Sequence, residues 1–290
     1  MNIEYMRAFL EIVSSGSFVE AANRLHVTQS ALSARIRTLE ERLNRRLFHR
    51  RRSGIELTHA GRRLLRHAQG CVQSWERAQQ EVALPDEISD LVSLGVQLNF
   101  WQSLGFPWTQ WMASHASQYA TRVVADYSEK LIGLLREGTL DLAVVYHGRG
   151  NRKLVVEEFL EERLVLVSTV PRALNRGWTP GYVFVNWSDA FQARHQEAFT
   201  DSPPPRLSIG SAGVALDHVL SQGGSGYFLE SQVTDLVVNG KLHYVEDAPV
   251  FRHRSYIIYP IESGVREAVD IALSGLRSVV NLPVRCPVST

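Results

Sequence analysis

Five residues near the N-terminus combine small or hydrogen-bonding side chains with helical spacing: Gln29, Ser30, Ser33, Ala34 and Arg37. At about 100° per residue, they share one sector of a helix. Small side chains let a helix approach DNA closely, and amide and guanidinium groups form paired hydrogen bonds with base edges in the major groove. The pattern predicts base contacts by Gln29, Ser30, Ser33 and Arg37. The alternative is an ordinary solvent-exposed helix face.

Three short helices are predicted to position these side chains. The first spans about 2–15 and ends at Gly16, the second begins after Ser17, and the third begins after Thr28, whose hydroxyl can cap it. Free N–H groups at the start of the third helix could bind a phosphate, so we expect Thr28 to contact the DNA backbone. Helical spacing of apolar residues predicts the inner faces. They are Ile3, Met6, Leu10 and Val13, then Phe18, Ala21, Ala22 and Leu25, then Leu32, Ile36, Leu39 and Leu43.

A basic hairpin follows in the segment LFHRRRSGIELTHAG, residues 47–61. Its apolar residues indicate two short strands around a turn at Ser53 and Gly54. Arg50, Arg51 and Arg52 lie at the tip and are expected to contact phosphates. A basic hairpin beside a helix-turn-helix is typical of a wing, and Thr58 then caps a long helix.

The stretch AANRLHVTQSALSARIRTLEERLNRRLF, followed by LTHAG, resembles the winged helix-turn-helix of the LysR-type transcriptional regulators. The resemblance covers residues 1 to about 66 and continues more weakly to about residue 280. The segment VNWSDAF is similar to a subgroup that includes a flagellar-operon regulator of enteric bacteria. Where many family members have Arg after the recognition Ser, this sequence has Ala34. Arg35 projects about 100° away, and we expect it to contact the DNA backbone.

This resemblance implies a sequence-specific transcriptional regulator whose two-lobed domain senses a small-molecule effector. The implied partners are a double-stranded DNA operator, the effector and further copies of the chain, as a dimer or tetramer. RNA polymerase is a further candidate partner. The resemblance also implies that the operator is an interrupted dyad.

The charge distribution supports a polyanion-binding N-terminus. Residues 1–84 hold 14 arginines, no lysine and 8 glutamates, a net charge of +6, whereas the rest of the chain carries −5. Such a split is typical of a basic head on an acidic body. Chance unevenness is the alternative, because charge alone does not identify a partner.

A long helix is predicted from about residue 59 to residue 84, before Pro85. Its apolar residues recur at alternating spacings of 4 and 3, which is typical of a seam that pairs with a second helix. The predicted dimer seam consists of Leu64, Ala68, Cys71, Trp75, Ala78 and Val82. Packing of the same face against the chain's own body is the alternative. Cys71 is interpreted as a small seam residue, with an intersubunit disulfide switch as the second interpretation.

Short apolar runs alternate with helical segments after residue 90. LVSLGV, TRVVADY, LDLAVVY and RLVLVST are predicted to be buried strands, with helices around Trp108 and after Ser128 between them. YVFVNW, PRLSIG, a helix over 214–220 and GGSGYFL form a second set. SYIIYP and a helix over 264–279 return to the first. This alternation predicts a mostly parallel sheet in two lobes, and it resembles the periplasmic-binding-protein-like domain of the family.

The predicted fold therefore has three parts. A mainly α winged helix-turn-helix spans 1–58, and a linker and dimerisation helix with its hinge spans 59–88. A two-lobed α/β effector domain spans 89–290, with lobe I at about 89–165 and 255–290 and lobe II at about 166–254.

Ligands of open α/β sheets bind at the carboxyl ends of strands, and this rule locates the candidate effector residues. They are Gln97, Asn99, Trp101, Ser128, Tyr146 and Ser211. Many relatives have small hydroxyl residues in the first loop, so the bulky amides of Gln97 and Asn99 argue against a simple carboxylate effector. Capping or ordinary loop structure is the alternative for each serine and for Gln97. Trp187 and Phe191 are interpreted as core residues.

Enzyme function is not supported by any motif. The sequence lacks a G-x-S-x-G elbow, a P-loop, a dinucleotide fingerprint and HExxH, and its histidines have no metal-ligand spacing. We expect no catalytic residue, metal or cofactor. His253 in FRHRS is predicted to lie on an edge strand with a basic outer face. A transporter's solute-binding protein is a third hypothesis, but it does not explain the basic front end.

The cellular location is predicted from three features. The N-terminus has no signal-peptide pattern, and no apolar stretch reaches the length of a membrane span. The two cysteines, Cys71 and Cys286, lie far apart and do not form a disulfide framework. These features predict a cytoplasmic protein with no membrane partner.

Overall fold

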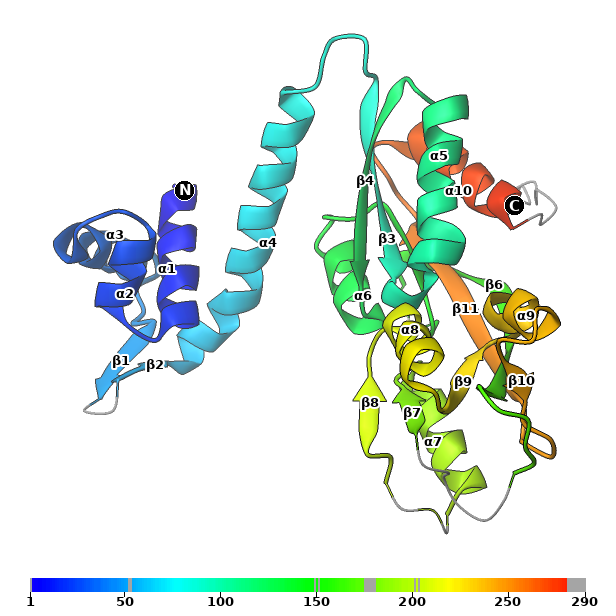
Figure 1. The fold of residues 1–290 in the computed structure, drawn as a ribbon. Coiled ribbons are helices and arrows are strands. Elements are labelled where there is room, and N and C mark those ends of the chain that lie inside the picture. The colour runs from blue at the N-terminus through cyan, green and yellow to red at the C-terminus, as the bar shows by residue number, and fades with distance from the viewer. Residues whose placement is uncertain are drawn as a thin grey trace. The chain divides into compact units, whose positions relative to one another are not determined.

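The computed structural model describes residues 2–51, 54–148, 150, 152–174, 181–200, 202 and 204–280. They form two compact units that divide between Asp86 and Glu87, with the short segment Arg136–Thr139 belonging to the first unit. Each unit is described by itself (Figure 1).

The N-terminal unit consists of three short helices, a hairpin and a long helix. The helices are α1 (Ile3–Ser15), α2 (Phe18–Arg24), α3 (Gln29–Leu43) and α4 (His59–Val82), and the hairpin is formed by β1 (Phe48–Arg51) and β2 (Gly54–Leu57). The winged helix-turn-helix arrangement predicted from the sequence is confirmed.

Local sequence signals set the helix boundaries of this unit. The side chains of Ser17, Thr28 and Thr58 each accept a hydrogen bond from an N–H group in the first turn of the following helix. Gly16 ends α1 with a φ of 67°, a left-handed conformation that glycine adopts at little cost. The three predicted caps and the predicted stop are confirmed.

The core of this unit differs from the predicted one at three helices, since Leu25 lies just past α2 and is only half-buried. In α1 the buried side chains are Met6, Ala8, Phe9 and Ile12, whereas Leu10 and Val13 are only half-buried. The reason is that α1 contacts α2, α3 and α4, so its buried face is rotated from the one that spacing alone predicts. In α3, Leu32, Ile36 and Leu39 are buried as predicted, but Leu43 is the last helical residue and is 42% exposed.

The described strands of the second unit form one nine-stranded sheet. The order is β4-β3-β5-β11-β6-β9-β7-β8, and β10 pairs with β6. Strands β3, β4 and β5 are parallel, as are β7, β8 and β9, while β11 pairs antiparallel with β5 and β6. The strands are β3 (Asp90–Gln97), β4 (Tyr119–Asp126), β5 (Leu142–Val145), β6 (Leu154–Ser168), β7 (Tyr182–Val185), β8 (Leu207–Ile209), β9 (Ser225–Leu229), β10 (His243–Tyr244) and β11 (Phe251–Pro260).

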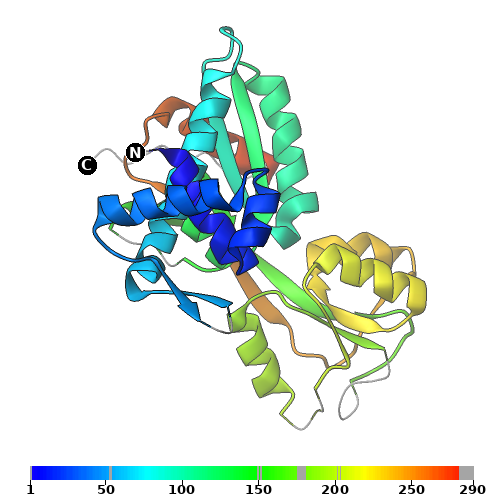
Figure 2. The ribbon, with the colours of Figure 1, turned by 90° about the vertical axis from the view of Figure 1, so that its left-hand side faces the viewer.

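Helices cover both faces of each lobe. In lobe I, α5 (Phe106–His115) and α10 (Arg266–Val279) lie side by side, and α6 (Ser128–Arg136) covers the opposite face (Figure 1). In lobe II, α7 (Asp189–Ala198) lies on one face, and α8 (Ala212–Gln222) and α9 (Glu230–Val238) lie on the other (Figure 2). The two-lobed architecture is confirmed, although α7 and α9 were not predicted.

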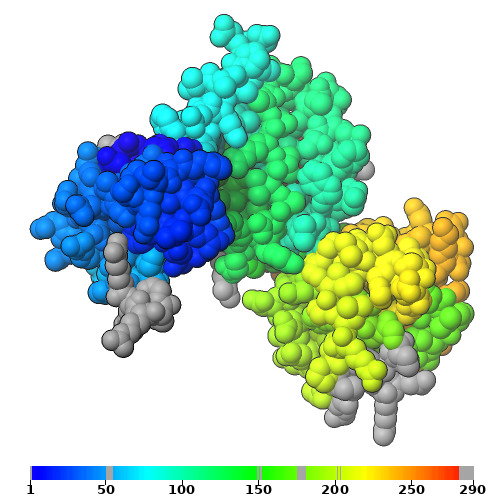
Figure 3. Space-filling model, turned by 60° about the vertical axis from the view of Figure 1, so that its left-hand side comes forward, coloured from blue at the N-terminus to red at the C-terminus, as the bar shows by residue number. Residues whose placement is uncertain are grey.

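The lobes are joined by the long strands β6 and β11. Figure 3 shows lobe I in green and lobe II in yellow as two bulges with a narrower neck between them. The edge-strand prediction for FRHRS is confirmed for this half of β11, which pairs with β6 alone and exposes Arg252 and Arg254. It fails for the strand as a whole, because the second half of β11 lies between β5 and β6. Trp187 and Phe191 are buried core residues, as predicted. None of the described helices is both long and apolar enough to span a bilayer.

Candidate nucleic-acid interface and effector site

The side of α3 that faces away from its core carries the predicted base-contacting residues. Gln29, Ser30, Ala34 and Arg37 are exposed, and Ser33 is half-buried. The opposite side of α3 packs against α1 and α2. The helix therefore presents one polar face with little side-chain bulk near its start.

The N-terminus of α3 is accessible. The Thr28 hydroxyl oxygen accepts a hydrogen bond from the N–H of Ala31 at 3.2 Å, and it lies 3.0 Å from the hydroxyl of Ser30. Both side chains are exposed. A helix N-terminus with accessible N–H groups favours a bound phosphate, which is compatible with the backbone contact predicted for Thr28.

Arg35 forms an ion pair with Glu4 of the same unit. Its guanidinium lies 3.6 Å from a carboxylate oxygen of Glu4 on α1, and its side chain is 28% exposed. This ion pair ties α3 to α1 and disfavours the predicted backbone contact, because binding a phosphate would require Arg35 to leave Glu4. Arg37 is exposed on the same helix.

The wing strands β1 and β2 are antiparallel, with Phe48 opposite Leu57 and Arg50 opposite Ile55. Arg50 and Arg51 belong to β1, so two of the three predicted phosphate-binding residues lie on the hairpin. Arg52 and Ser53 lie outside the described residues.

A buried carboxylate that sequence reasoning missed joins α3 to the wing. Glu40 is 8% exposed and accepts hydrogen bonds from the backbone N–H of Leu47 at 2.7 Å and from the guanidinium of Arg46 at 2.9 Å. The available signal was an acidic residue adjoining the apolar stripe of α3. Glu40 thus links α3 to the residues that lead into β1.

The start of α4 completes this junction. Thr58 donates its hydroxyl hydrogen to the carbonyl of Arg46 at 2.7 Å, and its backbone N–H donates to the carbonyl of Leu47 at 2.9 Å. A Cβ atom on Gly61 would lie 2.3 Å from that same Leu47 oxygen, so no larger residue fits. The LTHAG segment therefore packs α4 tightly against the entry to the wing.

The predicted dimer seam is divided along α4. Ala68 is fully buried in the core of its own unit, and Leu64 packs against the same core. The first half of the predicted seam therefore packs within the chain, which was the alternative to a dimer contact. Cys71 and Ala78 are half-buried, whereas Trp75 is 47% exposed and Val82 is 87% exposed. Two apolar side chains in the second half of α4 are therefore exposed. Cys286, the other cysteine, lies outside the described residues.

The carboxyl end of β3 connects the two lobes through Asn99. Gln97 ends β3 and accepts a hydrogen bond from the N–H of Asn99 at 3.3 Å. The Asn99 side-chain oxygen then accepts a hydrogen bond from the N–H of Ala212, the first residue of α8 in lobe II, at 2.8 Å. Two of the predicted effector residues therefore lie at the junction of the lobes.

Tyr146 follows β5 and lies in a cluster of aromatic rings. Its ring centre is 4.1 Å from that of His253, 4.9 Å from that of Phe100 and 6.2 Å from that of Trp187. The Ser128 hydroxyl accepts a hydrogen bond from the Tyr146 N–H at 3.1 Å. Ser128 therefore positions Tyr146. Because the Ser128 hydroxyl is already used in this bond, its predicted direct contact with the effector is disfavoured.

The remaining predicted effector residues lie at two helix starts. Ser211 precedes α8 and makes no side-chain capping bond, and it is half-buried. Trp101 is also half-buried, at the first position of a π-helical turn over Trp101–Gly105.

Three buried polar atoms near the lobe junction have no hydrogen-bond partner within the described part of the chain. They are the side-chain nitrogen of Asn99, the hydroxyl of Tyr146 and Nε2 of His253. Burial raises the pKa of Tyr146 well above its ordinary value, the charge of Glu162 adds to the shift, and the nearby Asn99 side chain opposes it. Burial, with the charge of Arg194, lowers the pKa of His253 to about 3. The cluster is thus uncharged near neutral pH, and sequence reasoning missed His253.

Comparisons with known proteins agree across both units. Residues 3–62 match the model for the bacterial regulatory helix-turn-helix protein, lysR family, and residues 86–277 match the LysR substrate binding domain. A relative from Yersinia enterocolitica, the HTH-type transcriptional regulator HdfR, is 28% identical over 255 residues, covering 83% of this chain and 87% of its own.

Solved structures share the same fold. CbnR, a LysR family transcriptional regulator, gives a TM-score of 0.68 at 15% identity and covers 96% of this chain and 99% of its own. DarR from Vibrio fischeri in complex with DNA gives 0.58 at 20% identity, with 95% and 98% covered.

Proposed function

Because the chain belongs to the LysR family of bacterial regulatory helix-turn-helix proteins, it is a DNA-binding transcriptional regulator with an effector-binding domain, and we propose which residues perform each task. Gln29, Ser30, Ser33 and Arg37 read base edges from the exposed face of α3. Thr28 binds a phosphate at the start of this helix. Arg50, Arg51 and Arg52 bind phosphates from the wing and set the affinity rather than the sequence preference.

The effector binds where the lobes meet, at Asn99, Tyr146 and His253. The observation that carries this proposal is a set of three buried polar atoms without hydrogen-bond partners in the described part of the chain, two of which belong to the adjoining side chains of Tyr146 and His253. Leaving a buried polar group unpaired costs roughly 1–3 kcal/mol, and a bound polar ligand removes that cost. Gln97, Trp101 and Ser211 border the same region, and Ser128 acts by holding Tyr146.

The chemistry of this cluster favours an uncharged polar group on the effector. Asn99 offers N–H donors, Tyr146 can donate or accept, and neutral His253 carries one donor and one acceptor nitrogen. A carboxylate would need a cation that these three residues do not supply. An amide, a hydroxyl or a heteroaromatic nitrogen matches them.

The chain acts in the cytoplasm as a homo-oligomer. Trp75 and Val82, the exposed apolar residues of the proposed seam, pair with α4 of a second copy, and RNA polymerase is a further partner. The proposed domain boundaries remain 1–58, 59–88 and 89–290, with the lobes divided near residues 165 and 255.

The test is footprinting of the full chain on the DNA upstream of its own gene and the divergent neighbouring gene. We expect protection of an interrupted dyad whose half-sites lie about one helical turn apart, because two recognition helices of a symmetric dimer would enter successive major grooves. Uniform protection of unrelated DNA at the same protein concentration would contradict the proposed base contacts.

A further inference from the structure

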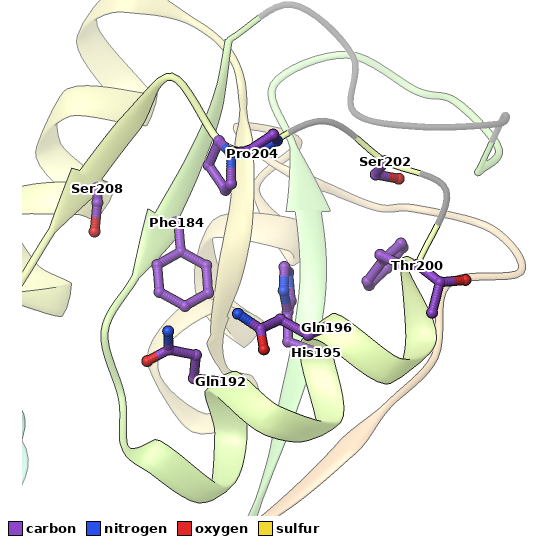
Figure 4. Close-up of a pocket in the computed structure, with 10 residues that line it drawn as sticks. Phe184, Gln192, His195, Gln196, Thr200, Ser202, Pro204 and Ser208 are labelled. Atoms are coloured by element: carbon purple, nitrogen blue, oxygen red, sulfur yellow. The ribbon is translucent and has the colours of Figure 1, made fainter.

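A groove of about 480 Å³ lies in lobe II, away from the Asn99–Tyr146–His253 cluster. It opens between α7 and the strands β7 and β8. Figure 4 shows the side chains of Gln192 and Gln196 reaching from α7 toward Phe184 on β7. Its volume falls within the roughly 300–1,000 Å³ of typical small-molecule sites.

The walls of this groove combine flat apolar surfaces with neutral hydrogen-bonding groups. Phe184, Phe199, Pro204 and Pro205 supply the apolar surfaces. Gln192 and Gln196 lie four residues apart on α7, so they project on the same side of the helix. The other neutral polar residues of the lining are Thr200, Ser202 and Ser208.

The floor of the groove is rigid and uncharged near neutral pH. His195 is 3% exposed, and its Nε2 lies 2.7 Å from the hydroxyl of Tyr182. Its ring packs against Phe184 and Phe191, at centre distances of 5.1 and 5.3 Å. Burial lowers the pKa of His195 to about 4. Among the described lining residues, none carries a full charge at neutral pH.

The helix α7 also contacts β11, the strand that runs into the lobe junction. Arg194 donates a hydrogen bond to the carbonyl of Arg252 on β11 at 2.6 Å, and Phe191 packs edge-on against Phe251. His253 is the next residue on β11. The helix that lines the groove and the cluster at the lobe junction therefore contact the same strand.

We propose that this groove is a second small-molecule site, which takes an uncharged, flat aromatic or heteroaromatic compound with amide-like or hydroxyl substituents. The ring lies between Phe184 and the proline wall, and the amides of Gln192 and Gln196 pair with the polar substituents. A carboxylate analogue is disfavoured because it would have to give up its hydration without gaining a cation from the described lining residues.

Benzamide and benzoate form a matched pair of probes, since they have the same ring and nearly the same shape but differ in charge. Ligand-observed saturation-transfer NMR with the full chain is expected to show saturable binding of benzamide with roughly millimolar affinity, as suits a fragment of this size. Benzoate is expected to give no saturable signal. Equal binding of the two probes, or no saturable signal from benzamide, would overturn the proposal.

Three variants locate the binding. Gln196→Trp fills the groove from an exposed helical position and is expected to weaken benzamide binding roughly tenfold or more. Gln222→Trp, on the exposed end of α8 in the same lobe, is the matched control and is expected to leave the affinity unchanged. Circular dichroism spectra and unfolding midpoints like those of wild type show that both variants fold.

The third variant separates this site from the one at the lobe junction. Tyr146→Phe is expected to retain the benzamide binding of the groove, because Tyr146 does not line it. Any binding that this variant loses belongs to the lobe junction, whose proposed site can also take an amide. Loss of binding in this variant together with retention in Gln196→Trp would assign benzamide to the lobe junction and overturn the second site, without affecting the proposed DNA contacts.

Discussion

The carboxylate of Glu40 holds the backbone N–H of Leu47 at 2.7 Å, and this bond joins the recognition helix to the first strand of the wing. The same carboxylate receives the guanidinium of Arg46 at 2.9 Å. One side chain thus joins the two elements that we propose to contact DNA.

Replacing Glu40 by alanine is expected to lower the free energy of unfolding by about 1–3 kcal/mol, because the buried N–H of Leu47 loses its acceptor. Operator affinity should fall as well, since the wing loses its fixed angle. Glu41→Ala, at the exposed neighbouring position, is the matched control. Thermal unfolding and fluorescence anisotropy with operator DNA measure the two effects. Equal stabilities of the two variants would show that Glu40 does not hold this junction.

Gln29→Ala tests base recognition. A good paired base contact contributes roughly 1–3 kcal/mol of discrimination, so operator affinity should fall about 5- to 150-fold while affinity for random DNA changes little. Gln118→Ala, an exposed amide outside the N-terminal unit, serves as the control. Titrations at several salt concentrations separate the phosphate contribution, which weakens steeply as salt rises. Equal losses on both DNAs would remove Gln29 from the base-reading set.

Tyr146→Phe tests the cluster at the lobe junction without knowledge of the effector. Its hydroxyl is buried without a partner among the described residues, so its removal should raise the free energy of unfolding of the ligand-free protein by about 1 kcal/mol. Tyr227→Phe is the matched control, because the Tyr227 hydroxyl donates to the carbonyl of Pro249 at 3.0 Å. This second variant should be less stable than wild type. A destabilised Tyr146→Phe protein would indicate that its hydroxyl is already satisfied.

The histidine at the lobe junction predicts a dependence of stability on pH. The folded-state pKa of His253 is about 3, against an ordinary value of 6.5, so only the unfolded chain takes up this proton between those values. Stability is therefore unaffected by this group above pH 6.5 and falls as the pH drops below it, by up to about 1.4 kcal/mol per pH unit. Urea unfolding of wild type and His253→Gln at pH 8, 6.5 and 5 measures this slope. The variant should show the shallower fall, and parallel slopes would argue against a buried neutral histidine.

The local signals in the sequence were sufficient for the N-terminal unit. Ser17, Thr28 and Thr58 cap helices through bonds to residues three positions away, and Gly16 ends α1 through its own backbone conformation. Such interactions depend on neighbours in the chain, so residue type and spacing reveal them.

The contacts that spacing could not reveal join distant segments. Glu40 finds its partners six and seven residues further on, across the end of α3. Tyr146 meets His253 because β11 returns between β5 and β6, a pairing of distant segments that residue spacing does not reveal. The amphipathic pattern of α1 identified a helix but not the rotation imposed by three neighbouring helices.

The bond between Asn99 and Ala212 has a consequence for how the effector domain opens. The first N–H group of α8 is satisfied by a side chain from the other lobe. Any hinge motion that draws the lobes apart breaks the hydrogen bond between the Ala212 N–H and Asn99. The N-terminus of α8 then carries an unpaired N–H group and its partial positive charge. The open form must therefore recruit a water molecule or an incoming oxygen atom at Ala212, which makes this one amide a natural reporter of closure by hydrogen exchange.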